Sequence, residues 1–331
     1  MEGVKTFYFD EPAARQIPYK SGQFLTFVDD ETGIEIRRSY SVASSPILHE
    51  PLAVGVKRIS NGYFSRKLID TAKVGDQLTT IGAGGFFILP ENIEQYQQLF
   101  FFAAGSGITP IYSLIKTVLY VHPHISVVLI YSNPSKEKTI FYKELNQLQK
   151  QFAGRFHIEF LFSNSPHLVK AHLHADLIRK FINHYAITDY NGMLFYICGP
   201  LNYMRLCTFT LQLDGVLPGH IKKESFNADK AIRKAQPPDK EAHVVRLLYQ
   251  QNKYDLNVQY PTTILQAAKK QRINLPYSCE VGRCGNCAAK CIKGKVWHSN
   301  NEVLTDADLA AGLVLTCVGY PVGGDVVIDI E

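Results

Sequence analysis

The sequence predicts a multidomain protein with three folded parts: an antiparallel β-barrel over residues 1–92, a doubly wound α/β sheet over 93–228 and a small α+β domain over 244–331. Three observations support this division. Short stretches rich in β-forming residues fill the first part, and long apolar stretches alternate with helical ones in the second. Three closely spaced cysteines and a distant fourth mark the last part. A charged, proline-containing segment over 229–243 is typical of a linker.

Length and composition fit this organisation. A chain of 331 residues exceeds one ordinary domain, and 46% apolar and 20% charged residues are normal for a globular protein. The net charge is only +5, and each part is nearly balanced, which argues against nucleic-acid binding. The longest apolar stretches have the length of strands, so no membrane span is expected. Seven cysteines, and no signal-peptide pattern at the N-terminus, predict a cytoplasmic protein.

The first part alternates short strands with turns. Stretches with glycine, serine or aspartate at 19–22, 29–33 and 74–76 are typical of turns. One short helix is predicted, Tyr63–Ile69. The predicted strands are Val4–Phe9, Gln23–Val28, Ile34–Tyr40, Leu52–Lys57 and Gln77–Ile81. A barrel with one helix is the simplest arrangement of these elements.

Two stretches of the barrel carry groups suited to a dinucleotide. Arg38, Tyr40 and Ser41 stand together at a strand end. An arginine pairs well with a pyrophosphate, an aromatic ring can lie on a flavin, and a hydroxyl can reach a ring nitrogen. Alone, this short pattern is more often an ordinary surface strand end. Gly62-Tyr63-Phe64-Ser65 opens the predicted helix, whose N–H groups suit a phosphate.

The second part alternates buried strands with helices. Its predicted strands are Leu99–Ala104, Ser126–Tyr131, His157–Phe162 and Met193–Cys198, which are continuously apolar. The predicted helices are Thr109–Tyr120, Ile140–Gln151, Ala175–His184 and Asn202–Leu213. Strand and helix repeated at this length predict a parallel sheet with right-handed crossovers.

Two turns of this sheet are candidates for binding a dinucleotide. In the first, Gly105 and Gly107 allow a phosphate to approach the backbone, and Pro110 suits the first turn of a helix. The full glycine fingerprint is incomplete, so this stretch by itself is better explained as an ordinary tight turn. The second turn, Cys198-Gly199-Pro200, ends a later strand at the edge where parallel sheets bind ligands, and it favours a binding site.

The cysteine-rich loop of the last part predicts an iron–sulfur site. Cys279, Cys284 and Cys287 have the C-x4-C-x2-C spacing of a plant-type [2Fe–2S] cluster, with Cys317 as the remote fourth ligand. Glycines between them allow backbone N–H groups to turn towards the cluster sulfurs. A zinc site would need a second cysteine or histidine pair, and disulfides would need an oxidising compartment, so we favour the cluster over both. Cys291 is expected to be a small buried residue outside the ligand set.

Regular elements surround this loop. A hairpin and two helices are predicted, over Val244–Tyr249 with Tyr254–Val258, over Ile264–Gln271 and over Leu304–Ala311.

The chain resembles the ferredoxin–NADP reductase superfamily across essentially its whole length. The similarity to the FAD domain of that superfamily lies in Arg38–Ser41, Val56–Arg58 and Gly62–Ser65. The similarity to the NAD(P) domain lies in Ala103–Pro110, Tyr131–Asn133 and Cys198–Pro200, and that to a plant-type, β-grasp ferredoxin domain in Leu275–Cys291 and Leu315–Cys317. This order of domains is typical of single-chain oxygenase reductases, and the similarity is strongest to the reductase subunits of phenylacetyl-CoA epoxidase systems.

The resemblance implies which residues bind FAD. Arg38 and the amides near Ser65 would hold the pyrophosphate. Tyr40 would pack on the flavin, and Ser41 would hydrogen-bond its N5 side. The remaining implied contacts are Val56, Lys57, Gly62, Tyr63 and Phe64.

The resemblance also implies how NAD(P)H is bound. Thr109 and Cys198 would flank the nicotinamide, and Phe226 would cover the flavin until nicotinamide displaces it. Together with Ser41, these are the residues expected to take part in hydride transfer. The other implied contacts are Gly105, Gly107, Asn133, Gly199 and Met204. Ser135, Lys136 and Lys138 suit a 2′-phosphate whereas Glu137 suits ribose hydroxyls, so NADH and NADPH both stay open.

The implied function is an electron relay. Hydride passes from NAD(P)H to FAD, and electrons leave singly through [2Fe–2S] to a protein acceptor, expected to be a terminal oxygenase, in phenylacetate or other aromatic degradation. A Rieske oxygenase, a desaturase or a cytochrome are alternative acceptors, and a redox-sensing module without catalysis is an alternative function. The near balance of charge over 244–331 favours a tethered ferredoxin domain, since a free shuttle commonly relies on a charge field. Relatives usually carry an extra strand before the equivalent of Glu2–Phe7, so either the start is short or the barrel is completed differently.

Overall fold

The computed structural model of this chain describes residues 3–30, 35–165, 171–226 and 235–330. The chain divides into two compact units, Met1–Asn227 and Ala228–Glu331. The first unit contains both the barrel strands and the parallel sheet, and the second contains the cysteine loop. Within the described ranges, no helix is long and apolar enough to cross a bilayer.

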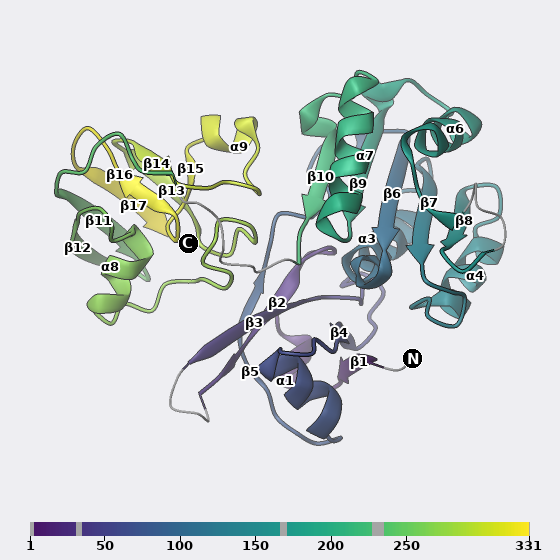
Figure 1. The fold of residues 1–331 in the computed structure, drawn as a ribbon. Coiled ribbons are helices and arrows are strands. Elements are labelled where there is room, and N and C mark those ends of the chain that lie inside the picture. The colour runs from purple at the N-terminus through teal and green to yellow at the C-terminus, as the bar shows by residue number, and fades with distance from the viewer. Residues whose placement is uncertain (1–2, 31–34, 166–170, 227–234, 331) are drawn as a thin grey trace. The chain divides into compact units, whose positions relative to one another are not determined.

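The N-terminal half of the first unit is built from antiparallel strands (Figure 1). The strands are β1 (Val4–Phe9), β2 (Phe24–Asp29), β3 (Ile36–Ser41), β4 (Leu52–Lys57) and β5 (Thr79–Gly84). β2 lies between β3 and β5, β1 pairs with β4, and an isolated bridge between Val42 and Val54 joins the two sheets. The predicted strands are confirmed within a few residues. The predicted helix begins at Tyr63 as α2 (Tyr63–Arg66) and continues as a π-helical turn over Lys67–Thr71, while α1 (Pro12–Arg15) was not predicted.

The second half of this unit is a five-stranded parallel sheet with the strand order β10-β9-β6-β7-β8. The strands are β6 (Gln98–Ala104), β7 (Ser126–Asn133), β8 (Phe156–Phe162), β9 (Met193–Cys198) and β10 (Ile221–Glu224). The helices are α3 (Ile108–Val121), α4 (Tyr142–Gln151), α6 (Ala175–Tyr185) and α7 (Leu201–Leu213). All predicted strands and helices of this part are confirmed. β10 was missed because its short sequence, Ile-Lys-Lys-Glu, lacks the apolar pattern of a buried strand.

The apolar character of β6 follows from its position in the middle of this sheet. Successive side chains of a strand point to opposite faces. Leu99 and Phe101 pack in the core shared with α3 and α4, whereas Phe100 and Phe102 pack in the core shared with α6 and α7. Both faces are covered, so each of these four side chains is fully buried. The direction of winding reverses between β6 and β9, and ligands of such sheets bind at the carboxyl ends of the strands at that point.

A polar seam joins the barrel to the sheet along α3. The Ser113 hydroxyl donates to the carbonyl oxygen of Ser44 over 2.6 Å, and the hydroxyls of Thr117 and Ser45 are 2.8 Å apart. The buried ammonium of Lys116 pairs with Glu50. Burial lowers the pKa of Lys116, and its contact with the carboxylate compensates part of that effect. These contacts help to hold barrel and sheet in one unit.

The second unit is a mixed sheet with a helix packed against it. Its main strand order is β12-β11-β17-β13-β15, with β11 and β17 parallel and the other neighbours antiparallel, and β14 pairs with β16 separately. The strands are β11 (His243–Tyr249), β12 (Asn252–Val258), β13 (Ala288–Lys293), β14 (Val296–His298), β15 (Leu313–Leu315), β16 (Gly319–Pro321) and β17 (Val326–Ile330). The helices are α8 (Ile264–Lys270) and α9 (Asp306–Ala310), which confirms the predicted hairpin and both helices.

Part of the predicted linker is folded against the second unit. Asp239 accepts a hydrogen bond from the backbone N–H of Gly323 over 2.7 Å and lies 2.6 Å from the Nε2 atom of His243. These bonds, that from Gly323 first, lower the pKa of Asp239 to about 2. Because of these bonds, the segment from Gln236 to His243 is folded as part of this unit. The predicted linker also covers residues 229–234, which lie outside the described residues.

Candidate functional site

The turn between β6 and α3 presses against the end of β9. Gly105 has a φ of +54°, which glycine adopts without strain. A Cβ atom on Gly107 would lie 2.1 Å from the carbonyl oxygen of Cys198. Only glycine fits at position 107. The structure therefore explains both glycines, Gly105 by its backbone angle and Gly107 by its close approach to β9. The turn lies at the carboxyl edge of the sheet, between the strands where its winding reverses.

Thr109 and Cys198 are buried at this edge. The Thr109 hydroxyl donates to the carbonyl oxygen of Ser106 over 3.0 Å. A Cβ atom on Gly55 of β4 would lie 2.7 Å from the Thr109 side chain, so the barrel reaches the turn here. Sequence reasoning missed Gly55, since a glycine within a strand has no distinctive pattern. Burial, and next the charge of Glu224, raise the pKa of the Cys198 thiol. A neutral thiol agrees with the expected non-nucleophilic role.

Ser41 of the barrel and Glu224 of the sheet meet directly. The Ser41 hydroxyl donates to a carboxylate oxygen of Glu224 over 3.1 Å, although the two residues are 183 positions apart. Glu224 lies opposite Cys198 in the register of β10 and β9. Ser41, Cys198 and Glu224 are therefore brought together at one place. Sequence reasoning did not single out Glu224, because the contact that gives it a role depends on the tertiary fold.

Glu224 makes the stability of this unit depend on pH. Burial raises the pKa of Glu224 to about 8, and the hydrogen bond from Ser41 opposes the rise. With the folded pKa above the unfolded one, its contribution is complete below pH 4.5 and is lost as the pH rises through 8. Glu224→Gln stays neutral, so its free energy of unfolding should fall less between pH 7 and pH 9 than that of the wild type. Urea titrations at both pH values measure this.

The exposed Glu91→Gln serves as the control for the loss of one carboxylate. It should show the same decline with pH as the wild-type protein. Equal declines in the wild type and in Glu224→Gln would contradict the assignment.

Arg38 and Tyr40 share one face of β3, as residues two apart on a strand do. The Arg38 side chain is exposed, and its Nη1 donates to the carbonyl oxygen of Arg37 over 2.7 Å. The Tyr40 ring is half-buried, with ring centroids 6.2 Å from Phe27 and 6.1 Å from Phe64. Burial raises the pKa of Tyr40, and the charge of Arg38 opposes this. A cation beside an aromatic ring fits the expected pyrophosphate and flavin contacts.

The start of α2 holds a backbone turn together. The Ser65 hydroxyl accepts from the N–H of Ile59 over 3.1 Å and donates to the carbonyl oxygen of Gly62 over 3.2 Å. Tyr63 is partly exposed, with 41% of its surface accessible. Gly62 has no side chain that could cap the helix, so the first N–H groups of α2 have no capping side chain.

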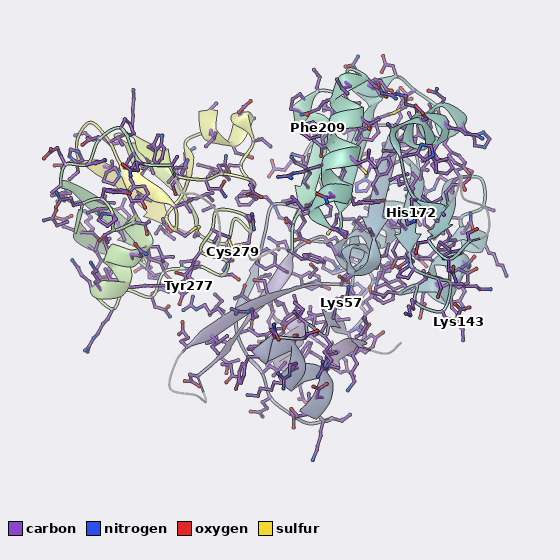
Figure 2. All side chains as sticks on the ribbon, viewed as in Figure 1. Lys57, Lys143, His172, Phe209, Tyr277 and Cys279 are labelled. Carbon is purple, nitrogen blue, oxygen red and sulfur yellow. The ribbon has the colours of Figure 1, made fainter. Side chains whose placement is uncertain are left out.

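Two of the residues expected to contact FAD have side chains inside the barrel core. The side chains of Phe64 and Val56 belong to the barrel core, where they are 3% and 0% exposed. Lys57, by contrast, is exposed at the end of β4 (Figure 2). The motif could not tell which side of the strand or helix each side chain occupies.

The pyrophosphate contact can be tested through flavin retention. Arg38→Ala is expected to weaken FAD binding by about 10- to 100-fold, because a hydrogen bond to a charged group contributes roughly 1.5–3 kcal/mol. The purified variant should lose FAD on gel filtration and keep its iron. Arg15→Ala, which removes an exposed arginine paired with Asp10 on the same half of the unit, is the control. FMN or no flavin in the wild-type protein would contradict the assignment of Arg38.

The remaining residues expected around the nicotinamide differ in how exposed they are. Asn133 is buried at the end of β7, and neither atom of its amide has a protein hydrogen-bond partner. Phe226 is 47% exposed, two residues after Glu224. A Cβ atom on Gly199 would lie 3.0 Å from that of Ala104. Met204 is 5% exposed and packs in the core under α7, which leaves little of its surface for a ligand.

The loop after β7 contains both the lysines that suit a 2′-phosphate and the glutamate that suits ribose hydroxyls. The Lys136 ammonium is 5.1 Å from the ring centroid of Tyr142. The Ser135 hydroxyl bonds the Glu137 carboxylate and, as the largest effect, lowers its pKa. The acidic group is therefore already bonded within its own loop, while the lysine lies over an aromatic ring.

The four predicted cluster ligands form two thiol pairs in the second unit. Cys279 (Figure 2) is hydrogen-bonded to Cys284, and Cys287 to Cys317. The bond from Cys284, followed by bonds from backbone N–H groups, lowers the pKa of Cys279 to about 5. The bond from Cys317 likewise lowers the pKa of Cys287. Gly282 and Gly285 have φ angles of +74° and +76°, as expected for a loop that turns its amides inward.

This arrangement fits a two-iron cluster. In a [2Fe–2S] cluster each iron takes two protein ligands, so four cysteines are expected in pairs. Backbone N–H groups of Val281 and Asn286 lie 3.5 Å from the sulfurs of Cys279 and Cys284. The Asn286 side-chain nitrogen is buried without a protein partner, which suits a further donor to such a group.

Cys291 differs from expectation in its exposure. It lies on β13, as predicted for the outgoing strand, but it is half-buried rather than buried. The register of β13 with β17 shifts between Cys291 and Lys293. Such a bulge disturbs the alternation of buried and exposed side chains. The Cys291 thiol donates to the backbone carbonyls of Lys293 and Gly294 at 3.5 and 3.7 Å.

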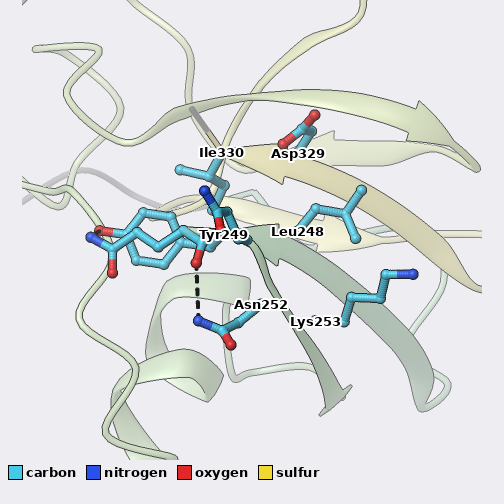
Figure 3. Close-up of a pocket in the computed structure, with 8 residues that line it drawn as sticks. Leu248, Tyr249, Asn252, Lys253, Asp329 and Ile330 are labelled. Atoms are coloured by element: carbon cyan, nitrogen blue, oxygen red, sulfur yellow. Dashed lines mark hydrogen bonds between the residues drawn. The ribbon is translucent and has the colours of Figure 1, made fainter.

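A hollow of about 440 Å³ on the second unit is separate from these cysteines (Figure 3). It lies at the turn of the β11–β12 hairpin beside the end of β17. None of the predicted site residues lines it. Its lining residues are Leu248, Tyr249, Gln250, Gln251, Asn252, Lys253, Asp329 and Ile330. They include no serine, threonine, cysteine or histidine.

Three family models match this chain, each to one of its parts. The oxidoreductase FAD-binding domain matches residues 2–88, and the oxidoreductase NAD-binding domain matches residues 101–208. The 2Fe-2S iron-sulfur cluster binding domain matches residues 249–322. These matches coincide with the barrel, the parallel sheet and the cysteine-containing unit.

Individual proteins resemble the chain over nearly its whole length. A subunit of the 1,2-phenylacetyl-CoA epoxidase of Escherichia coli (strain K12) is 31% identical over 98% of this chain and 92% of its own length. The structure of phthalate dioxygenase reductase, described as modular for electron transfer from pyridine nucleotides to [2Fe–2S], has a TM-score of 0.59 and 23% identity over 99% of this chain and 94% of its own. An intact type IV self-sufficient cytochrome P450 monooxygenase has a TM-score of 0.74 and 21% identity over 99% of this chain, which spans only 39% of that longer protein. At these identities the two structures show the fold alone.

Proposed function

Because this chain belongs to the oxygenase reductases of the ferredoxin–NADP reductase superfamily, we propose that it delivers electrons from NAD(P)H to a separate terminal oxygenase. The chain is an NAD(P)H-dependent oxidoreductase with FAD and a [2Fe–2S] cluster as cofactors. When bound, FAD accepts the two electrons of a hydride and the cluster takes electrons singly, which is why both are needed. The observation that carries the proposal is the pairing of four cysteines beneath inward-facing amides.

The first unit supplies the place for hydride transfer. Gly105 and Gly107 keep the turn at the sheet edge open to a dinucleotide. The buried Thr109 and Cys198 would bound the nicotinamide, and the neutral Cys198 thiol would position it without forming a bond to it. When the Glu224 carboxyl group is protonated, it would donate to the Ser41 hydroxyl, which would then donate to the flavin ring, so that a proton could pass between the ring and the carboxyl group.

The Glu224 carboxyl group is suited to that proton exchange. Its pKa of about 8 lies near neutral pH, where a carboxyl group can both hold and release a proton. Phe226, partly exposed and near this carboxyl group in sequence, would shield the flavin when nicotinamide is absent. Arg38 and the amides at the start of α2 would hold the pyrophosphate at the barrel.

The second unit supplies the exit for electrons. Cys279 and Cys284 would bind one iron, and Cys287 and Cys317 the other. The relatives with similar domains are named as part of an epoxidase and as the reductase of a dioxygenase. We therefore place an oxygenase of the phenylacetyl-CoA epoxidase kind first among acceptors and a dioxygenase second. Cysteines without disulfide bonds suit a reducing cytoplasm.

Kinetic assays with two acceptors test this function. The purified protein should oxidise NADH or NADPH with ferricyanide, which can collect electrons at the flavin, and with cytochrome c, which should depend on the cluster. Comparison of kcat/KM for the two nucleotides assigns the preferred one. Addition of a purified phenylacetyl-CoA epoxidase oxygenase with its substrate should give product only when the reductase is present. Failure to oxidise either nucleotide in a protein that contains FAD and iron would contradict the proposal.

A further inference from the structure

The segment from Asn300 to Glu302 braces the cysteine loop from outside. The Asn300 side-chain amide donates to the carbonyl oxygen of Val281 over 2.8 Å. The backbone N–H of Glu302 donates to the carbonyl oxygen of Gly282 over 3.0 Å. Both bonded carbonyls belong to the stretch between the first two cysteines. This brace is made by residues that the cysteine motif does not contain.

Each braced carbonyl belongs to a peptide group whose N–H faces a cysteine sulfur. The carbonyl of Val281 and the N–H of Gly282 share one planar peptide, and that N–H donates to Cys317. The carbonyl of Gly282 and the N–H of Arg283 share the next peptide, and that N–H donates to Cys279. Because a trans peptide directs its C=O and N–H in opposite directions, fixing the oxygen also fixes the N–H. The brace thus aims one N–H at each of the two thiol pairs.

An ion pair between a buried arginine and a partly exposed carboxylate attaches the same segment by side chains. The Arg283 guanidinium, with its side chain 8% exposed, donates through Nε to the Glu302 carboxylate over 2.9 Å. Arg283 directly precedes Cys284, so a positive charge lies near the ligand loop and Glu302 compensates it. A charge at such a partly buried position is weakly screened by salt.

We propose that Asn300 and Glu302 are positioning residues that set the reduction potential of the [2Fe–2S] cluster. The inference rests on the proposed assignment of Cys279, Cys284, Cys287 and Cys317 as its ligands. One electron from the reduced flavin adds one negative charge to the site, and no bond or proton is exchanged in this step. Hydrogen bonds to the sulfurs and the net charge nearby determine how favourable that added charge is. Asn300 acts through the amide N–H of Gly282, and Glu302 acts by compensating Arg283.

The two residues should shift the potential in opposite directions. Asn300→Leu has a similar size but cannot donate, so the Gly282 N–H is no longer held towards Cys317 and the reduced state is less favoured. Glu302→Gln keeps an acceptor for Arg283 but removes one negative charge from the site, so the reduced state is more favoured. We expect a change of about tenfold in the ratio of oxidised to reduced protein in each case, equivalent to ~59 mV for one electron.

Redox titration of the full-length protein, followed by the EPR signal of the reduced cluster, measures these shifts. Asn257→Leu and Asp255→Asn make the same chemical changes at exposed positions of β12 and should leave the potential unchanged. Iron and acid-labile sulfide are measured first in every variant. If a variant incorporates the cluster incompletely, the titration still compares potentials, because the EPR signal comes only from protein that contains a cluster.

The possible outcomes distinguish a failure of this inference from a failure of the cluster assignment on which it rests. Opposite shifts of Asn300→Leu and Glu302→Gln, with both controls unchanged, support the proposal. Unchanged potentials, or shifts of both variants in the same direction, overturn it while the cluster assignment stands. A wild-type protein without iron and labile sulfide would instead overturn the assignment of the four cysteines.

Discussion

Cys284→Ser is expected to abolish the visible absorption and the reduced EPR signal of the iron–sulfur cluster. Cytochrome c reduction should fall by about 100-fold or more, since even residues that only support metal ligands account for 10–100-fold. Ferricyanide reduction should persist, because the flavin lies in the other compact unit. The reason is the pairing: without the Cys284 thiolate, Cys279 has no partner to complete the ligands of one iron.

Cys291→Ser is the matched control for this experiment. It changes another cysteine of the same unit, one whose thiol donates to the carbonyls of Lys293 and Gly294. Its absorption, EPR signal and cytochrome c reduction should equal those of the wild type. If Cys291→Ser lost the EPR signal and Cys317→Ser kept it, the ligand set proposed here would be wrong.

The second large effect is expected for Gly107→Ala. Its new Cβ atom would meet the carbonyl oxygen of Cys198, a backbone atom that cannot rotate away. The turn and the end of β9 must separate, which should lower the free energy of unfolding by about 3 kcal/mol, the upper range for overpacked sites. Flavin reduction by NAD(P)H should become at least about tenfold slower, since small misplacements at a reacting centre are costly. Stopped-flow absorbance at the flavin band and urea unfolding measure the two effects.

Gly219→Ala provides a control in the same unit. Its Cβ atom would meet no atom within 4 Å, and its backbone has no positive φ. Neither the rate of flavin reduction nor the free energy of unfolding should change appreciably. A Gly107→Ala protein that reduces its flavin at the wild-type rate would show that the turn does not need to touch β9 for hydride transfer.

The proposed set of cluster ligands rests on a pattern that is mostly local. Three of the four cysteines stand within nine residues, and the glycines that turn the backbone lie between them. The fold class was equally accessible. The continuous apolar stretches of β6, β7 and β9 are required by any strand covered on both faces, and they are visible without coordinates.

Side-chain orientation was less accessible from the same motifs. Val56 and Phe64 lie in stretches that resemble a flavin-binding surface, yet their side chains fill the barrel core. Cys291 was expected inside because it lies on a strand, but a register shift leaves it half-exposed. In each case the direction of a side chain depends on the residue's position in the alternation of the strand, on a bulge, or on its position around the helix. A motif specifies none of these.

The sequence by itself determined the three-part organisation, the cofactors and the spacing of the cluster cysteines, because each is encoded in composition or in residues close together in the chain. Only the tertiary structure decided the contacts between distant segments. Ser41 meets Glu224 across 183 positions, Gly55 packs on Thr109, and Asn300 orients a peptide of the cysteine loop. The physical reason is that such contacts arise when separately formed elements pack, and neither member of a pair carries a local pattern that identifies the other.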